Sequence, residues 1–261
     1  MKSLHRSLMI VTAAIAVVLG TAACHKSFDP KIYASNPDAL FAASLSQFNR
    51  KHYEDAAKGF DQLTHNLPAR DPLLPVSYYY LGQAQEKGGS HLLAAQSLAR
   101  IADAFPDDSL ADDALLASGR AYAKMWRKPE LDAQYGISAE RTLQTLVSLY
   151  PDSKLVPAAN AEIGRLDNMF AGKDLQTAEH YMHRGAYDSA IIYLKDIIRL
   201  HPGTPAARNA SLRLLDSYRA IRYTADARDL CDAITKTYPS DREVRAQCGS
   251  ASSAAVSTPR T

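Results

Sequence analysis

The sequence predicts an all-α protein, a solenoid of about five helix–turn–helix repeats. Apolar residues between positions 37 and 247 recur at helical spacing, without the sustained alternation that marks strands. Five prolines each close an apolar stretch, and twelve residues before each of them stands an alanine, so one pattern repeats along the chain. The prolines are Pro68, Pro106, Pro151, Pro202 and Pro239, and the alanines are Ala56, Ala94, Ala139, Ala190 and Ala227.

Larger residues follow each alanine in a constant register. Four residues after the alanines come Phe60, Leu98, Leu143, Leu194 and Cys231, and three residues later come Leu63, Ile101, Leu146, Ile197 and Ile234. A small residue lets two antiparallel helices approach closely, and a large residue one turn later fills the groove between them. The proline then prevents the second helix of the pair from continuing. This pattern resembles the tetratricopeptide repeat (TPR).

Residues 1–23 are predicted to be a cleaved export signal. Lys2 and Arg6 give a basic start, Leu8–Leu19 is uncharged and apolar, and small residues precede Cys24. The junction resembles a bacterial lipobox, which implies a lipid on Cys24, with an N-acyl and an S-diacylglycerol group. Residues 24–36 would then be a tether. The alternative is an ordinary cleavage site followed by an incidental cysteine. His25, where an aspartate would resemble an inner-membrane retention signal, favours the outer membrane.

The charge balance excludes a general nucleic-acid-binding protein. The export signal holds two of the 30 basic residues and no acidic residue, so 28 basic residues remain against 28 acidic ones. Binding to nucleic acid needs a basic surface that neutralises phosphates. No nucleic-acid partner is therefore expected.

The later segments depart from a uniform repeat. Residues 126–136, which contain Pro129, form an insertion in repeat three, and a long helix of roughly residues 156–184 leads into repeat four. The Ser/Ala/Thr-rich tail, residues 248–261, is predicted to be disordered. Cys231 and Cys248 either form a disulfide in an oxidising compartment or remain separate, as a buried apolar residue and a stray thiol.

No sequence motif indicates an enzyme, a metal site or a cofactor site. Phosphate-binding loops, nucleophile elbows and paired Cys-x-x-Cys motifs are absent from the sequence. His180 and His183 lie one helical turn apart beside Glu179, but a solvated helix side explains them better than metal binding does.

Several motifs resemble the BamD family, the TPR lipoproteins of the β-barrel assembly machinery. They are Tyr150-Pro151-Asp152-Ser153 with the long helix after it, Ala178-Glu179-His180-Tyr181, Arg184-Gly185-Ala186-Tyr187, and residues 204–210 from Thr204 to Ala210. The resemblance implies a non-enzymatic scaffold at the periplasmic face of the outer membrane. Its partners would be the POTRA region of the barrel insertase BamA and unfolded outer-membrane proteins. The alternative function is a TPR adaptor for cell-wall or envelope-division enzymes.

Repeats one and two, residues 37–110, are predicted to hold clients. Helix register leaves a second apolar stripe in repeat one, which packing within the repeat does not require. The first helix of repeat two has an equivalent face. In a TPR superhelix this face lines the concave groove, and such grooves bind extended peptides. The predicted client-binding residues are Phe41, Leu45, Phe48, Tyr79, Gln83 and Lys87. The alternative is that the tether, with Phe28, Ile32 and Tyr33, covers the stripe.

Repeats three to five, residues 111–247, are predicted to dock the insertase. The predicted partner-binding residues are Trp126 in the insertion and Arg165, Asn168 and Lys173 on the long helix. The alternative for Trp126 is that it caps the core beneath the insertion.

Overall fold

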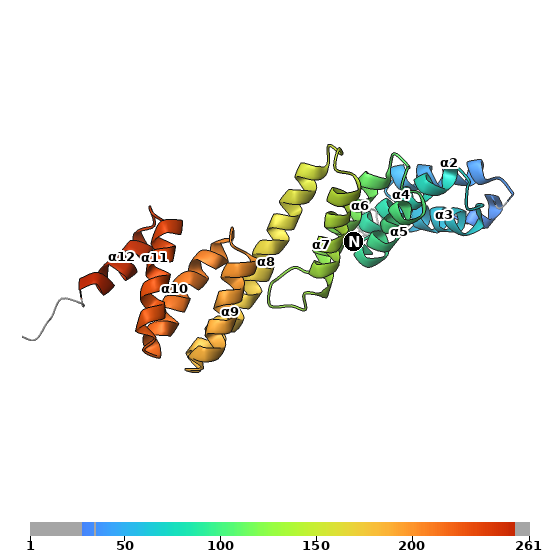
Figure 1. Ribbon diagram of the computed structural model, residues 1–261. Helices are drawn as coiled ribbons and strands as arrows, with labels where there is room; N and C mark the ends of the chain where they lie inside the picture. Colours follow the sequence, from blue (N-terminus) through green and yellow to red (C-terminus); the bar gives the residue numbers. More distant parts are fainter. Residues whose placement is uncertain (1–27, 34, 254–261) are drawn as a thin grey trace, which may run out of the picture. The chain divides into compact units, whose positions relative to one another are not determined.

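The computed structural model describes residues 28–33 and 35–253, and in this part of the chain every regular element is helical. Cys24 and residues 254–261 lie outside the described residues. The short 3₁₀ helix η1 (Pro30–Tyr33) precedes the α-helices (Figure 1). These are α2 (Pro37–Asn49), α3 (Tyr53–Asn66), α4 (Leu73–Lys87), α5 (His91–Ala104), α6 (Ala111–Met125), α7 (Gln134–Leu149), α8 (Val156–His183), α9 (Tyr187–Leu200), α10 (Pro205–Ala220), α11 (Thr224–Thr237) and α12 (Arg242–Ser253). The all-α prediction is confirmed.

The chain divides into two compact units at Gly88 and Gly89. In the first unit α2 packs on α3, α3 packs on α4, and α2 also contacts α4. In the second unit each helix from α5 to α12 packs on the next, and α8 contacts both α6 and α10. The predicted boundary between residues 110 and 111 separates the client-binding repeats from the insertase-docking repeats. It is a functional boundary and stays a prediction.

The repeated register forms the core of the helix pairs. The five alanines lie in α3, α5, α7, α9 and α11, where the first four are fully buried and Ala227 is 9% exposed. The residues four and seven positions later are buried in every case. Their side chains therefore occupy the interior that the helical spacing predicted for them.

The two helices of a pair end in different ways. Each predicted proline stands directly after the C-cap residue of a second helix, as Pro106 follows Phe105 at the end of α5. First helices end in a left-handed residue instead: Lys51 after α2, Gly89 after α4, Gly185 after α8 and Arg222 after α10. A left-handed residue after the C-cap reverses the chain within a tight turn. Helix α6, whose C-cap is Trp126, leads into the insertion instead.

The tail prediction is wrong in part, because helix α12 runs to Ser253. Asp241 caps its start by accepting hydrogen bonds from the backbone N–H groups of Glu243 and Val244, at 2.9 and 3.1 Å. A disulfide joins Cys231 of α11 to Cys248 of α12, with their Cα atoms 5.4 Å apart. The cap stabilises the start of α12, and the disulfide joins the helix to α11. Residues 248–253 are therefore helical, although their composition predicts disorder.

No helix among residues 28–33 and 35–253 has the length and apolar character needed to cross a membrane.

An ion pair fastens α10 to the start of α12. Arg208 donates from Nε and Nη2 to the two carboxylate oxygens of Asp241, both at 2.9 Å, and Nη2 also lies 2.7 Å from Glu243. The hydrogen bonds from Arg208 are the main reason why the pKa of Asp241 falls to about 2. The unfolded value is about 3.9, so this carboxylate stabilises the fold above about pH 4, and the stabilisation is lost as the pH falls toward 2.

We expect Asp241→Asn to lower the melting temperature at pH 7, because the substitution removes the charge that pairs with Arg208. An asparagine still accepts the two capping hydrogen bonds, so the helix start is retained. Thermal melts monitored by circular dichroism should show the difference between the two chains shrinking from pH 4 to pH 2. A difference that does not change with pH in this range would contradict the assigned role of the charge.

Candidate binding surfaces

The aromatic residues of α2 belong to a cluster that joins the three helices of the first unit. The ring of Phe41 lies 5.5 Å from that of Phe60 in α3 and 5.9 Å from that of Tyr80 in α4, centroid to centroid. Phe48 lies 5.5 Å from Tyr80, and Tyr80 stacks on Phe60 at 5.5 Å. Leu45 packs against the same core. Phe41 therefore does contribute to packing within its repeat, contrary to the sequence-based expectation.

Tyr80 is the residue of this cluster that the sequence analysis missed. Its ring contacts Phe41, Phe48, Phe60 and Tyr79. The run of three tyrosines at residues 78–80 was the available signal, but helical spacing alone does not say which of the three rings turns toward α2. Phe41, Leu45 and Phe48 are half-buried. They therefore lie at the edge of the core and leave part of each side chain at the surface.

The tether packs on both α2 and α3, with side-chain contacts to α3. Phe28 stacks with Tyr33, and its ring lies 3.0 Å from the position that a Cβ on Gly59 would occupy. Gln62 Nε2 donates to the carbonyl of Pro30 at 3.4 Å. The tether therefore covers α3 at Gly59 and Gln62. The rings of Phe41 and Phe48 pack against Tyr80 instead.

The predicted client residues on α4 form a stripe at the surface of the first unit. Tyr79, Gln83 and Lys87 follow one another at intervals of four residues, which places them on one side of the helix. Tyr79 and Gln83 are half-buried, and Lys87 at the last turn of the helix is exposed. The stripe thus runs from an aromatic ring to a cation.

Trp126 is a core residue, so its interpretation as a surface contact is corrected. The indole is 1% exposed and lies 4.5 Å from the ring of Phe170 in α8. A Cβ on Gly136 would lie 2.1 Å from the indole Cε3, so the start of α7 needs glycine to accommodate the ring. Trp126 caps the core beneath the insertion, as the alternative stated.

Lys173 holds the insertion against α8. Its Nζ donates to the backbone carbonyls of Pro129 and Leu131 at 3.2 and 2.9 Å, and Gln176 donates to Glu130 at 3.1 Å. Arg165 and Asn168 are exposed on the same helix. Arg165 pairs with Glu162 at 2.9 Å, and Asn168 donates to the carbonyl of Gly164. Of the four predicted partner residues, these two remain on the surface.

A partly buried polar cluster joins α7, α8 and the C-cap residue of α9. His201 hydrogen-bonds Asp167 through Nδ1. Burial is the main cause that raises the pKa of Glu140 and of Asp174, and the nearby Asp167 raises that of Glu140 further. Among the described residues no group of three or more His, Cys, Asp and Glu side chains could hold a metal ion. His183 bonds the carbonyl of Glu179 in its own helix.

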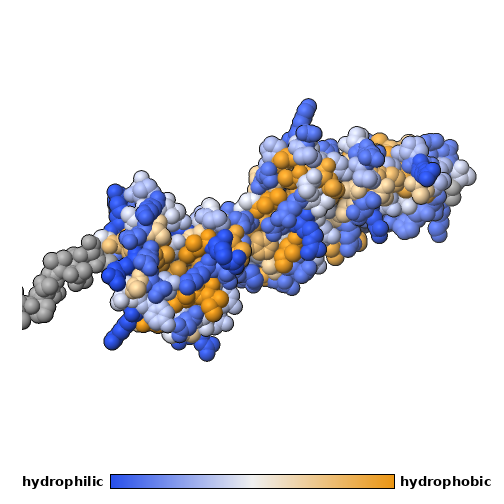
Figure 2. All heavy atoms as spheres, in the orientation of Figure 1, coloured by the Kyte–Doolittle hydropathy of each residue, from blue (hydrophilic) through white to orange (hydrophobic). Residues whose placement is uncertain are grey.

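Figure 2 shows hydrophobic surface over the α9 region, where Ile192 and Leu200 are 64% and 53% exposed. None of the predicted site residues lies on this helix.

We expect Lys173→Met to release the insertion without unfolding the second unit. The substitution removes two hydrogen bonds from a charged donor, a loss of about 1 kcal/mol at a partly exposed site. Hydrogen exchange should accelerate in residues 127–133, while α9 and α10 keep their protection. Lys154→Met, at an exposed cation outside the insertion, is the control. Unchanged exchange in residues 127–133 would show that the two carbonyl contacts do not hold the loop.

Comparison with known proteins identifies a family whose model matches most of the chain. A family model described as "YfiO: Outer membrane lipoprotein" matches residues 33–233. The outer membrane protein assembly factor BamD of Caulobacter vibrioides is 22% identical over 240 residues, which cover 89% of this chain and 77% of that protein. BamD of Neisseria gonorrhoeae is also 22% identical, over 88% of this chain and 91% of that protein.

Solved TPR structures also match. The TPR domain of P58(IPK) is 14% identical with a TM-score of 0.44, covering 84% of this chain and 56% of that one. A thermophilic TPR protein of Thermus thermophilus is 18% identical with a TM-score of 0.35, covering 82% of this chain and 98% of that one. The family assignment depends on the sequence match, which spans most of the repeat region: the chain belongs to the YfiO family of outer membrane lipoproteins, the BamD family.

Proposed function

We propose that the chain is a non-enzymatic scaffold in the assembly of outer-membrane β-barrel proteins. One observation carries the proposal: the relatives named as outer membrane protein assembly factors align with 84–89% of the chain. The stacked helix pairs also present extended surfaces, which suits the binding of other proteins.

Attachment to the membrane is proposed to occur through Cys24. Acyl chains on the cysteine contribute about 0.8 kcal/mol per buried CH₂, so two or more chains hold a domain stably at a bilayer. The tether that begins at Cys24 would lead to Phe28, which packs against α3. The chain would then stand at the periplasmic face of the outer membrane.

Clients are proposed to bind the first unit along the α4 stripe. Tyr79 offers an aromatic face, Gln83 offers an amide, and the exposed Lys87 offers a cation at the end of the stripe. This order suits a peptide that ends in an aromatic residue and a carboxylate. The half-buried Phe41 and Phe48 pack against Tyr80, the neighbour of Tyr79 on α4, and Leu45 packs in the same core. They would support the α4 stripe from α2.

The barrel insertase is proposed to bind the second unit at α8 through its POTRA region. Helix α8 is 28 residues long and packs on both α7 and α9, so it offers a rigid surface. Arg165 and Asn168 are the exposed candidates. Trp126 and Lys173 would act indirectly, by fixing the insertion against this helix.

A pull-down from detergent-solubilised outer membrane tests the proposed function. We expect a POTRA-containing barrel protein to co-purify with the wild-type chain, and less of it with the Arg165→Glu, Asn168→Glu chain. Arg141→Glu, at an exposed cation of α7, should retain it. Cys24→Ser should leave the membrane fraction. Recovery of a peptidoglycan enzyme without any barrel protein would favour the adaptor function instead.

The client stripe is tested with a peptide that ends in an aromatic residue and a free carboxylate. We expect Lys87→Glu to weaken its binding about tenfold, or about 1.4 kcal/mol, because the cation becomes an anion. Arg70→Glu, at an exposed cation of the first unit, should have little effect. The peptide with an amidated C-terminus should lose this difference between the variants. Equal losses for both peptides would contradict recognition of the carboxylate by Lys87.

A further inference from the structure

The disulfide between α11 and α12 lies in a surface pocket of the second unit. The pocket has a volume of about 590 Å³, and both Cys231 and Cys248 line it. Cys248 is half-buried, whereas Cys231 is only 6% exposed. A disulfide in a folded protein exchanges with a thiolate only when the thiolate can reach one of its two sulfurs. Cys248 is therefore the more accessible half of this bond.

The charges beside the disulfide suit the approach of a thiolate. Lys236 of α11 and Arg245 of α12 line the same pocket and are exposed, and Asp232 adds one negative charge. Arg245 donates to the backbone carbonyl of Ser240 at 3.3 Å, and this neutral acceptor leaves the charge of the guanidinium uncompensated. Nearby cations attract a thiolate and stabilise the thiolate that leaves when the bond opens.

Helix α12 is attached to the rest of the second unit at several points along its length. At its start, Arg208 of α10 pairs with Asp241 at 2.9 Å. Val244, in the first turn, is fully buried. The disulfide at Cys248 follows one turn later and joins the helix to α11. The start of the helix is thus held by contacts that do not involve the disulfide.

The last residues of α12 depend more strongly on the disulfide. Arg219 donates to the carbonyl of Gln247 at 2.7 Å, so this charged contact ends one residue before Cys248. Beyond Cys248 the helix consists of glycine, serine and alanine, and glycine and serine favour a helix less than alanine does. A Cβ on Gly249 would meet no atom within 4 Å, so no neighbouring element packs there. Without the cross-link, such a helix end should fray.

We propose that this pocket is a site of thiol–disulfide exchange, at which a dithiol reductant opens the bond between Cys231 and Cys248 and releases residues 248–253 from α11. The partner is therefore a protein of the dithiol–disulfide oxidoreductase class. An oxidising compartment keeps the bond closed, and the same class of protein in its disulfide form would close it again. The proposal does not depend on the insertase or the clients proposed above.

The exchange takes place in two steps. The thiolate of the reductant forms a bond to the sulfur of Cys248, while the bond to Cys231 breaks and Cys231 leaves as a thiolate that takes up a proton. The second thiol of the reductant then attacks the mixed disulfide and releases Cys248 as a thiol. The chain gains two electrons and two protons, and the dithiol is oxidised to a disulfide.

Reduction of the folded, full-length chain tests access to the bond. Dithiothreitol is the probe, and mass spectrometry of the alkylated peptides that contain Cys231 and Cys248 is the readout. We expect the rate to rise in proportion to the dithiothreitol concentration, because attack occurs on the folded chain. A rate that levels off at the rate of global unfolding would show that the bond opens only in unfolded chains, and it would overturn the proposal.

Two small thiols of opposite charge test the pocket as the point of attack. We expect the ratio of the rate constants for 2-mercaptoethanesulfonate and cysteamine to fall at least about threefold in the Lys236→Gln, Arg245→Gln chain at low salt. Arg228→Gln with Arg242→Gln removes exposed cations from the same two helices outside the pocket lining, and should change the ratio less than twofold. Equal changes in both variants would contradict attack through this pocket.

Hydrogen exchange measures the structural consequence. After reduction, we expect the amides of residues 248–253 to exchange at least about tenfold faster, while residues 245–247 and helix α10 keep their protection. Cys248→Ser, which cannot form the bond, should match the reduced wild-type chain. Unchanged protection of residues 248–253 in both samples would overturn the proposal. Loss of protection throughout α10 and α11 would also overturn it, because the bond would then hold the whole unit rather than this segment.

Discussion

Close contact at a small residue is the constraint on which the helix pairs depend. Ala56, Ala139 and Ala190 have no exposed surface, and any larger side chain there would push the facing helix away. The large residue one turn later, such as Leu143, then reaches the space between the helices and is itself buried. This one contact explains why the register holds although the lengths between repeats differ.

The insertion and the long helix α8 are two parts of one device. A loop between α6 and α7 would otherwise carry exposed backbone, but Lys173 and Gln176 bind it and Trp126 fills the space beneath it. The same tryptophan lines a pocket between α6 and α8. The loop is therefore fastened to α8 and covers a packed core.

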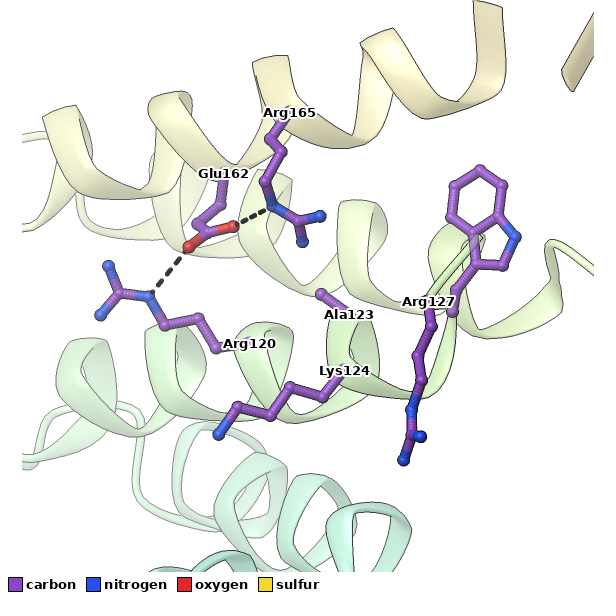
Figure 3. Close-up of a pocket in the computed structure, with 7 residues that line it drawn as sticks. Arg120, Ala123, Lys124, Arg127, Glu162 and Arg165 are labelled. Atoms are coloured by element: carbon purple, nitrogen blue, oxygen red, sulfur yellow. Dashed lines mark hydrogen bonds and ion pairs between the residues drawn. The ribbon is translucent and has the colours of Figure 1, made fainter. Parts of the chain in front are cut away.

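The candidate sites could be predicted only in part. Sequence periodicity located the stripe on α4 and the exposed face of α8. It did not find the ion pair between Arg120 of α6 and Glu162 of α8 (Figure 3). These two residues lie about forty positions apart, and they meet only because α6 packs on α8.

By itself, the sequence determined that the repeats are helical, the register of their buried residues and where the second helices end. Helical spacing, small residues and prolines act within a few residues, so local physics is enough to specify them. Only the tertiary structure decided that Tyr80 joins Phe41 to Phe48, that Trp126 is buried, and that Cys231 meets Cys248 across α11 and α12. Each of these depends on residues distant in sequence whose rotation and approach are set by the packing of whole helices.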